Sequence, residues 1–337
     1  MVQRDHIMGL TNTLAGWFRS APPLNSETRV ALGRVVEVVG RPIASVSGFE
    51  RRLGAPIQAA LKYCDGLVTS LPGTIDINRR AFSLDPLVHA FFSTPRDIEE
   101  MLGRSQTLRE FLSDPKSFGI EHIHGLFAAR RREKQVMGIA LQGEMLRQDV
   151  PQTLLYFSTH TLTAVAADLQ ATRNMLNAAA FDSLLKSFVA QADAIRRERQ
   201  GLEAERDLER ARLRGQHAGK ETSAIAEHQQ KLSDLELGMR NMTESLQPDR
   251  LVDALATFLS EPELALRLEP VTVRVDRNGV LADKLDASAG PEGGLYFPEL
   301  VGRDRRRYVV MLACIPRDEA QRAVTEILDQ QRRFILI

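Results

Sequence analysis

Two clusters of arginine have the residue type and spacing of an anion-binding site. The planar guanidinium group matches the geometry of phosphate and carboxylate, with which it forms paired hydrogen bonds. Each cluster separates two strand-like runs, so we expect both at hairpin turns, and turns of one sheet can converge. Charged turns also simply keep hairpins soluble, and this interpretation stays open. The clusters consist of Arg130, Arg131 and Arg132, and of Arg303, Arg305, Arg306 and Arg307.

A metal site is the second chemistry that the residue spacing suggests. His122 and His124 are two residues apart, so in an extended strand both imidazoles would lie on one face. A catalytic zinc needs a third protein ligand, which only tertiary structure could bring from His160 or Glu121. We therefore expect polar or hydrogen-bonded histidines and predict no metal.

Sequence signatures of catalysis are missing. The chain has no phosphate-binding G-x-x-x-x-G-K-S/T, no strand-linked G-x-G-x-x-G, no H-E-x-x-H and no G-x-S-x-G. Cys64 and Cys314 are the only cysteines, both in apolar contexts and without local histidine partners, so we expect core thiols. We favour a non-enzymatic protein without a cofactor, although a catalytic triad assembled by tertiary structure stays open.

Composition bounds the partners and the compartment. Over 337 residues, 44 basic and 44 acidic residues cancel, so no global field favours nucleic acid or an anionic membrane. No run of about 18 apolar residues predicts a membrane span, and the N-terminus lacks a signal-peptide core. With only two cysteines, we expect a cytoplasmic protein with no nucleic-acid partner and no stable membrane insertion.

The first third of the chain has helical patterns that begin and end at recognisable residues. Helices are expected over residues 5–19, from Asn25 or Ser26 to Gly40, and from a capping box at Ser47 to Gly66. The valine-rich run from Val35 to Val39 would also suit a strand. Several short helices should follow, starting after Asp85, Thr94 and Ser105, two of them with proline at the first position. Five phenylalanines should form a small core here, with a groove for a partner as the alternative: Phe82, Phe91, Phe92, Phe111 and Phe118.

Strand patterns occur in two places. Residues 122–131, 134–142 and 153–162 predict a three-stranded meander, and Val271, Val273 and Val275 precede the hairpin signal Asn278-Gly279. A second hairpin is predicted over residues 295–301 and 307–315, before a last helix over 317–331. Because a short meander is barely stable alone, we expect one sheet drawn from both places.

A long helical hairpin separates the two strand regions. Phe181, Phe188, Ile195 and Leu202 follow one another by seven residues, and the polar tip Gln216-His217-Ala218 divides this arm from the next. An arm of about 50 residues would reach roughly 75 Å, so we expect part of it to project. Pro248 should open a separate helix to Leu259. The stripe of the second arm, which could bind another chain, contains Ile225, Leu232, Leu235, Met239, Met242 and Leu246.

The sequence therefore predicts a mainly helical α+β protein, with a small antiparallel sheet body and a long inserted antiparallel helical hairpin. Its expected divisions are an N-terminal helical region (1–120), the first part of the sheet (121–162), the hairpin with a short helix (163–260), and the second part of the sheet with the last helix (261–337). We expect an interaction or scaffold protein that binds a partner or a second copy through the hairpin. The alternative is a regulatory domain or enzyme that recognises a small phosphate-bearing anion through the two arginine clusters.

Overall fold

The chain divides into two compact units, each built from segments that are far apart in the sequence. The computed structural model describes residues 25–142, 145–216, 222–276, 279–281 and 294–335. One unit combines Met1–Ala60 with Phe188–Ser260, and the other combines Leu61–Ser187 with Glu261–Ile337. Helices α2 (Phe49–Thr69) and α7 (Leu169–Gln216) continue from one unit into the other.

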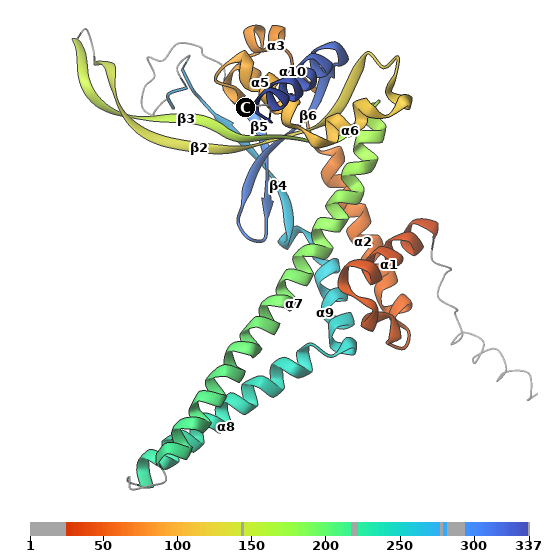
Figure 1. Ribbon diagram of the computed structural model, residues 1–337, viewed down its shortest axis with the longest axis vertical. Coiled ribbons are helices and arrows are strands. Elements are labelled where there is room, and N and C mark those ends of the chain that lie inside the picture. Colours follow the sequence, from red (N-terminus) through yellow and green to blue (C-terminus); the bar gives the residue numbers. More distant parts are fainter. Residues whose placement is uncertain (1–24, 143–144, 217–221, 277–278, 282–293, 336–337) are drawn as a thin grey trace, which may run out of the picture. The chain divides into compact units, whose positions relative to one another are not determined.

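One six-stranded sheet forms the centre of the second unit (Figure 1). The strand order is β3-β2-β6-β5-β4, and β1 pairs in parallel with β6. Strand β2 pairs with β6, with Ile123 opposite Ile315, so the prediction of one sheet on both sides of the hairpin is confirmed. Of the residues that the structure describes, helices hold 62% and strands 25%, which also confirms the mainly helical α+β class. The strands are β1 (Ile75–Asp76), β2 (His122–Gln142), β3 (Met145–Ala166), β4 (Leu266–Val273), β5 (Leu295–Gly302) and β6 (Arg307–Pro316).

The predicted three-stranded meander is wrong, because β2 continues without a break through the charged run at Arg130–Lys134. Strands β2 and β3 pair with each other over nearly their whole length. Side chains alternate between the two faces of a strand, so Arg131 and Glu133 lie on the same face. There Arg131 forms ion pairs with Glu133 and with Glu299. A charged side chain is compatible with a strand when it is solvated or ion-paired. In β2, Arg131 is ion-paired on one face, and Arg132 and Lys134 are exposed to water on the other.

Three irregularities in the pairing of β2 with β3 all insert their extra residue into β3. The register shifts lie near Asp149, Thr159 and Ala164, and each of these residues has a positive φ, between 51° and 61°. Such bulges bend the strand that carries them and increase its twist. Strand β2 therefore keeps an uninterrupted alternation of its two faces, while β3 absorbs the curvature.

The main core covers one face of the sheet with short helices. Phe91 packs against Phe127, Phe157 and Phe297 at ring distances of 4.9–6.2 Å. The predicted caps are confirmed: Asp85 and Ser105 cap α4 and α6, and Thr94 forms a capping box with Asp97 at the start of α5. The prediction that Phe118 belongs to the core is wrong, since this side chain is 71% exposed. The helices of this layer are α3 (Arg79–Leu84), α4 (Pro86–Phe91), α5 (Pro95–Arg104), α6 (Gln106–Ser113) and α10 (Arg317–Ile335), and a 3₁₀ turn, η2 (Pro115–Ser117), follows α6.

The opposite face of the sheet carries a smaller core. Leu312 on β6 is fully buried there, together with Val68 from the end of α2 and Leu176 from the start of α7. The two long helices are thus fixed to the sheet by their ends that belong to this unit. Helix α2 runs past Gly66, where we expected it to end, to Thr69.

The other unit is helical. Helix α1 (Ser26–Val39) begins at the predicted cap Asn25 and ends at Gly40, and the 3₁₀ helix η1 (Arg41–Ser45) follows. Arg52 on α2 forms ion pairs with Asp249 and Asp253 on α9 (Pro248–Ser260), which a second 3₁₀ helix, η3 (Pro262–Leu264), follows in the sequence. The predicted hairpin is confirmed as α7 and α8 (Thr222–Ser245).

Some predicted features lie outside the described residues. These are the helix over 5–19, the hairpin tip at His217-Ala218 and Asn278 of the predicted turn. Within the described ranges, no helix combines the length and apolar character needed to cross a bilayer.

Candidate functional site

The two arginine clusters meet at one buried carboxylate. Arg131 on β2 donates from Nε to Glu299 Oε1 at 2.7 Å, and Arg307 at the start of β6 donates from Nη1 to Glu299 Oε2 at 3.1 Å. The Glu299 side chain is 1% exposed, whereas those of Arg131 and Arg307 are 27% and 46% exposed. The convergence predicted for the two clusters therefore occurs for one arginine of each, around an acid that the sequence analysis did not single out.

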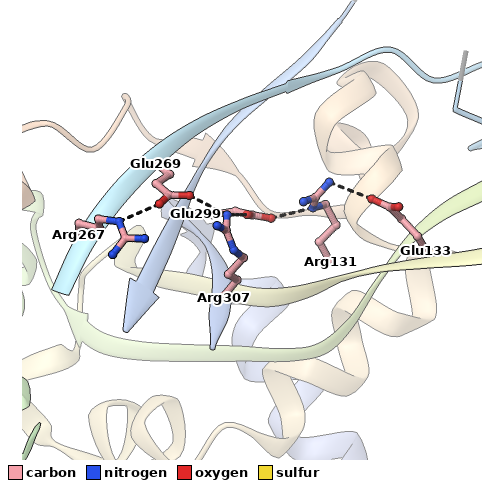
Figure 2. Close-up of polar contacts among 6 residues, drawn as sticks. All are labelled: Arg131, Glu133, Arg267, Glu269, Glu299 and Arg307. Atoms are coloured by element: carbon pink, nitrogen blue, oxygen red, sulfur yellow. Dashed lines mark hydrogen bonds and ion pairs between the residues drawn. The ribbon is translucent and has the colours of Figure 1, made fainter. Parts of the chain in front are cut away.

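The contact extends into a row of alternating charges across four strands (Figure 2). Arg307 Nη1 also lies 2.7 Å from Glu269 Oε2, and Arg267 Nε lies 2.8 Å from Glu269 Oε1. At the other end, Arg131 Nη1 lies 3.0 Å from Glu133 Oε1. We call these six residues the ionic row: Arg267, Glu269, Arg307, Glu299, Arg131 and Glu133.

The sheet register explains why the row needs Arg307 at its centre. Glu269 and Glu299 are direct cross-strand partners, and two like charges in these positions repel. Arg307 bridges both carboxylates. The hydrogen bond from Arg267, ahead of that from Arg307, lowers the pKa of Glu269, and the hydrogen bond to Glu299 raises the pKa of Arg307.

The ionic row neutralises itself, and this limits what Arg131 and Arg307 can bind. Glu299 faces the main core beside its cross-strand partner Val309, which is fully buried. A phosphate or carboxylate ligand would have to compete with Glu299 for both guanidinium groups. The ionic row therefore has the character of a structural ion-pair network at the edge of the core and not of an open anion-binding pocket.

The remaining arginines of the clusters lie apart from the row. Arg130 donates to the Tyr308 hydroxyl at 2.8 Å and stacks over that ring at 5.0 Å. The first cluster lies within β2, so its predicted position in a turn is wrong. Three members of the second cluster, Arg303, Arg305 and Arg306, lie in the turn between β5 and β6 as predicted, whereas Arg307 begins β6. In this turn, Arg306 pairs with Asp304 at 3.1 Å. The other three arginines of the two clusters are exposed: Arg132, Arg303 and Arg305.

The apolar stripe predicted for the second hairpin arm faces the first arm. Leu235 is 8% exposed, and a side chain added at Gly238 would touch Leu202 of α7. Leu208 on α7 and Leu237 on α8 are 53% and 56% exposed. Four stripe residues are only partly covered, Leu232, Met239, Met242 and Leu246, while Ile225 lies in α8 with its side chain outside the described part.

A polar contact that the sequence analysis missed joins the two arms. The Glu209 side chain on α7 is 2% exposed and accepts hydrogen bonds from His228 on α8 and from Arg212. Lys231 lies 3.8 Å from the same carboxylate and 2.9 Å from Glu205. The hydrogen bond from His228 is the main cause that lowers the pKa of Glu209. In the sequence, the sign of this contact is a histidine, His228, at an otherwise apolar position of the heptad pattern in the second arm.

The histidines near the start of β2 do not gather with a third ligand. His122 and His124 share a face, but His160 lies in the main core, where it stacks on Phe92 at 4.9 Å. Its Nε2 lies 2.7 Å from the Phe91 carbonyl. Burial lowers the pKa of both His124 and His160. Among the residues that the structure describes, no three metal-ligating groups come together.

The two cysteines are held as thiols. Cys64 is buried as predicted, and this burial raises its pKa to about 12. Cys314 is not in a purely apolar context: burial raises its pKa, and the neighbouring Asp76 carboxylate raises it further. The pKa of each thiol is raised, so the thiolate needed for nucleophilic chemistry is disfavoured at both positions.

The described residues thus offer charged and apolar surfaces. Two surfaces stand out, the hairpin with its incompletely covered stripe and the charged strand β2. No family model, curated protein or solved structure matches the chain.

Proposed function

We propose that the protein is a non-enzymatic interaction or scaffold protein that binds another protein chain through the hairpin of α7 and α8. One observation carries this proposal. From residue 193 to residue 247, Glu209 and Leu235 are the only described residues that are buried. Two arms whose sequences carry heptad stripes but that cover so little of their apolar surface have area left for a further helix.

The exposed leucines support the same proposal. Leu208 and Leu237 each expose more than half of their surface on a helix whose other outward residues are mostly charged. Burying apolar surface on a partner contributes about 25 cal/mol per Å², before the entropy of association is subtracted. We propose a coiled-coil type of contact, in the cytoplasm, where two free thiols such as Cys64 and Cys314 are expected.

The alternative, recognition of a small phosphate-bearing anion by the two arginine clusters, has weaker support. Arg131 and Arg307 already bind Glu299, so only the exposed arginines are left for a ligand. We retain it as the second candidate for the exposed turn between β5 and β6.

Two kinds of variant test the proposed function. The first removes residues 203–237 and joins Leu202 to Gly238 through a short Gly-Ser linker, since these two residues already lie side by side. The second replaces Leu208 and Leu237 by Asp, with Ala211→Asp and Gln229→Asp as the matched control at exposed positions.

Cross-linking in extracts of the source cell, followed by mass spectrometry, and light scattering of the purified chain provide the measurements. We expect cross-links or self-association that the deletion and the leucine variant lose and the control retains. Equal cross-linking by all four proteins would remove the hairpin from the function.

A further inference from the structure

The outer half of β2 has an open edge. Strand β2 pairs with β3 as far as Gln142 but with β6 only from His122 to Ala129. From Arg130 to Gln142, its edge away from β3 therefore has no strand partner in the described part of the chain. Figure 1 shows β2 and β3 running on beyond the other strands as a two-stranded ribbon. Such an edge presents a row of backbone donors and acceptors to any extended chain.

The two faces of this edge differ in charge. Arg131 and Glu133 belong to the face of the ionic row, where each has a partner. Arg132 and Lys134 lie on the opposite face and are exposed, and no described carboxylate forms an ion pair with either. Arg130 shares this face but is bonded to Tyr308, so Arg132 and Lys134 are the two cations available to a ligand here.

Farther along the edge, apolar side chains replace the charges. Met137 is 67% exposed and Ile139 is 59% exposed. Because the irregularities lie in β3, β2 alternates without interruption, and both side chains lie on the face opposite to Arg132 and Lys134. The open edge therefore offers two cations on one face and, three to seven residues later, two apolar side chains on the other.

We propose that this edge binds an extended acidic segment of a partner protein, which adds to the sheet as a further strand beside β2. Backbone hydrogen bonds hold such a segment, and its alternate side chains set the specificity. Two carboxylates spaced two residues apart would meet Arg132 and Lys134. Two apolar residues, five and seven positions from the first carboxylate, would meet Met137 and Ile139 on the other face.

A second copy of the chain fits this edge less well. In a two-fold antiparallel pairing of two β2 edges, even-numbered residues lie opposite even-numbered residues on the same face. Between Arg130 and Gln142, no even-numbered residue is acidic. A pairing centred on Glu133 would place Arg132 opposite Lys134, and like charges in that position repel. Charge complementarity therefore favours an acidic partner.

Designed peptides test the proposal on the full chain. The acidic probe is Thr-Asp-Thr-Glu-Thr-Thr-Val-Thr-Val-Thr with a fluorescent label, together with the reversed sequence for the opposite strand direction. The neutral control replaces Asp and Glu by Asn and Gln. Two further peptides are the acidic probe with N-methyl groups on the odd-numbered or on the even-numbered residues, each of which removes the hydrogen-bond donors from one edge. Fluorescence anisotropy measures affinity at low and high salt.

We expect the acidic probe to bind with an affinity that falls with salt, and roughly tenfold more tightly than the neutral control, as two surface ion pairs allow. Binding should protect backbone amides between Arg130 and Gln142 from hydrogen exchange. Arg132→Gln with Lys134→Gln should remove the preference for acid. The charge-matched control, Arg303→Gln with Arg305→Gln, should keep it.

Four results would overturn the proposal. The first is the absence of binding by either acidic sequence, and the second is equal binding by the Arg132→Gln, Lys134→Gln variant. Binding that N-methylation does not weaken, in either choice of alternate residues, would indicate attraction between charges without strand addition. Protection of the edge that appears only as protein concentration rises would assign it to a second copy. None of these results bears on the hairpin, which is outside this surface.

Discussion

Glu209 on α7 and His228 on α8 are joined by a hydrogen bond that links the two arms of the hairpin. In the folded chain this bond and the nearby Lys231 and Arg212 lower the pKa of Glu209 below its ordinary value of 4.5. A lowered carboxyl pKa contributes stability above the unfolded pKa, and this contribution disappears as the pH falls through the folded value. The arms should therefore loosen in acid.

The test is hydrogen exchange of the two arms from pH 7 down to pH 3. We expect exchange, corrected for its intrinsic pH dependence, to quicken below about pH 4.5 in the wild type. The Glu209→Gln variant should exchange faster at neutral pH and show less change in acid. Glu227→Gln, at an exposed position on α8, serves as the control. Identical pH profiles for wild type and Glu209→Gln would contradict the assigned contact.

Loss of Glu299 should destabilise the sheet. Glu299→Gln leaves the guanidinium groups of Arg131 and Arg307 without their shared carboxylate at the rim of the core. Hydrogen bonds to charged groups contribute about 1.5–3 kcal/mol, and the partial exposure of both arginines favours the lower end. We expect the free energy of unfolding in urea to fall by about 2 kcal/mol.

The control for Glu299 is Glu133→Gln, which removes another partner of Arg131. The Glu133 side chain is 47% exposed, so its ion pair is screened by water. Its loss should cost less than about 1 kcal/mol. Equal effects of the two substitutions would show that the burial of Glu299 has no energetic consequence.

Gly103 allows α5 and α10 to approach closely. A Cβ atom added there would lie 2.4 Å from Ile327 Cγ1 and 2.6 Å from the backbone oxygen of Ala323. Because a helix backbone cannot yield cheaply, Gly103→Ala should destabilise the chain by about 1–3 kcal/mol. Gly201→Ala on α7, where nothing lies within 4 Å, should instead stabilise its helix by about 0.5–1 kcal/mol. Thermal denaturation of both variants checks the opposite signs.

The thiols should react slowly in the folded chain. Burial raises the pKa of Cys64 from 9.0 to about 12. The contribution of the buried thiol to the free energy of unfolding is therefore present below pH 9 and is lost as the pH rises toward 12. Iodoacetamide at pH 8 should modify Cys64 only on unfolding. Asp76→Asn should speed the modification of Cys314, because the Asp76 carboxylate raises the pKa of that thiol. An unchanged rate for Cys314 would contradict this influence.

Local patterns were sufficient to predict most elements. The side chains of Asn25, Asp85 and Ser105 accept hydrogen bonds from backbone amides two or three residues later. Both groups of such a bond lie in one short stretch of sequence, so the bond can be predicted from that stretch. The heptad stripes predicted the hairpin for the same reason, since an apolar face must be covered wherever the chain places it.

The errors came from contacts between distant segments. Residues 130–134 carry five charged side chains in succession, and the partner of Arg131, Glu299, comes from β5, far away in the sequence. Glu299 itself is one acid among many in the sequence, and nothing local distinguishes it from the exposed Glu133. The burial of Glu209 against His228 depends in the same way on how the two arms align.

The pairing of β2 with β6 has a consequence for the order in which the chain folds during translation. Strands β2 and β3 leave the ribosome before the whole of the hairpin, yet Phe127 and Ile123 reach their final neighbours only when Met311 and Ile315 have been made. A two-stranded hairpin is marginally stable in water without further strands. Domains that are contiguous in sequence fold in the order of synthesis. Here the sheet must remain unfinished, with Phe127 lacking its cross-strand neighbour Met311, until β6 has been synthesised.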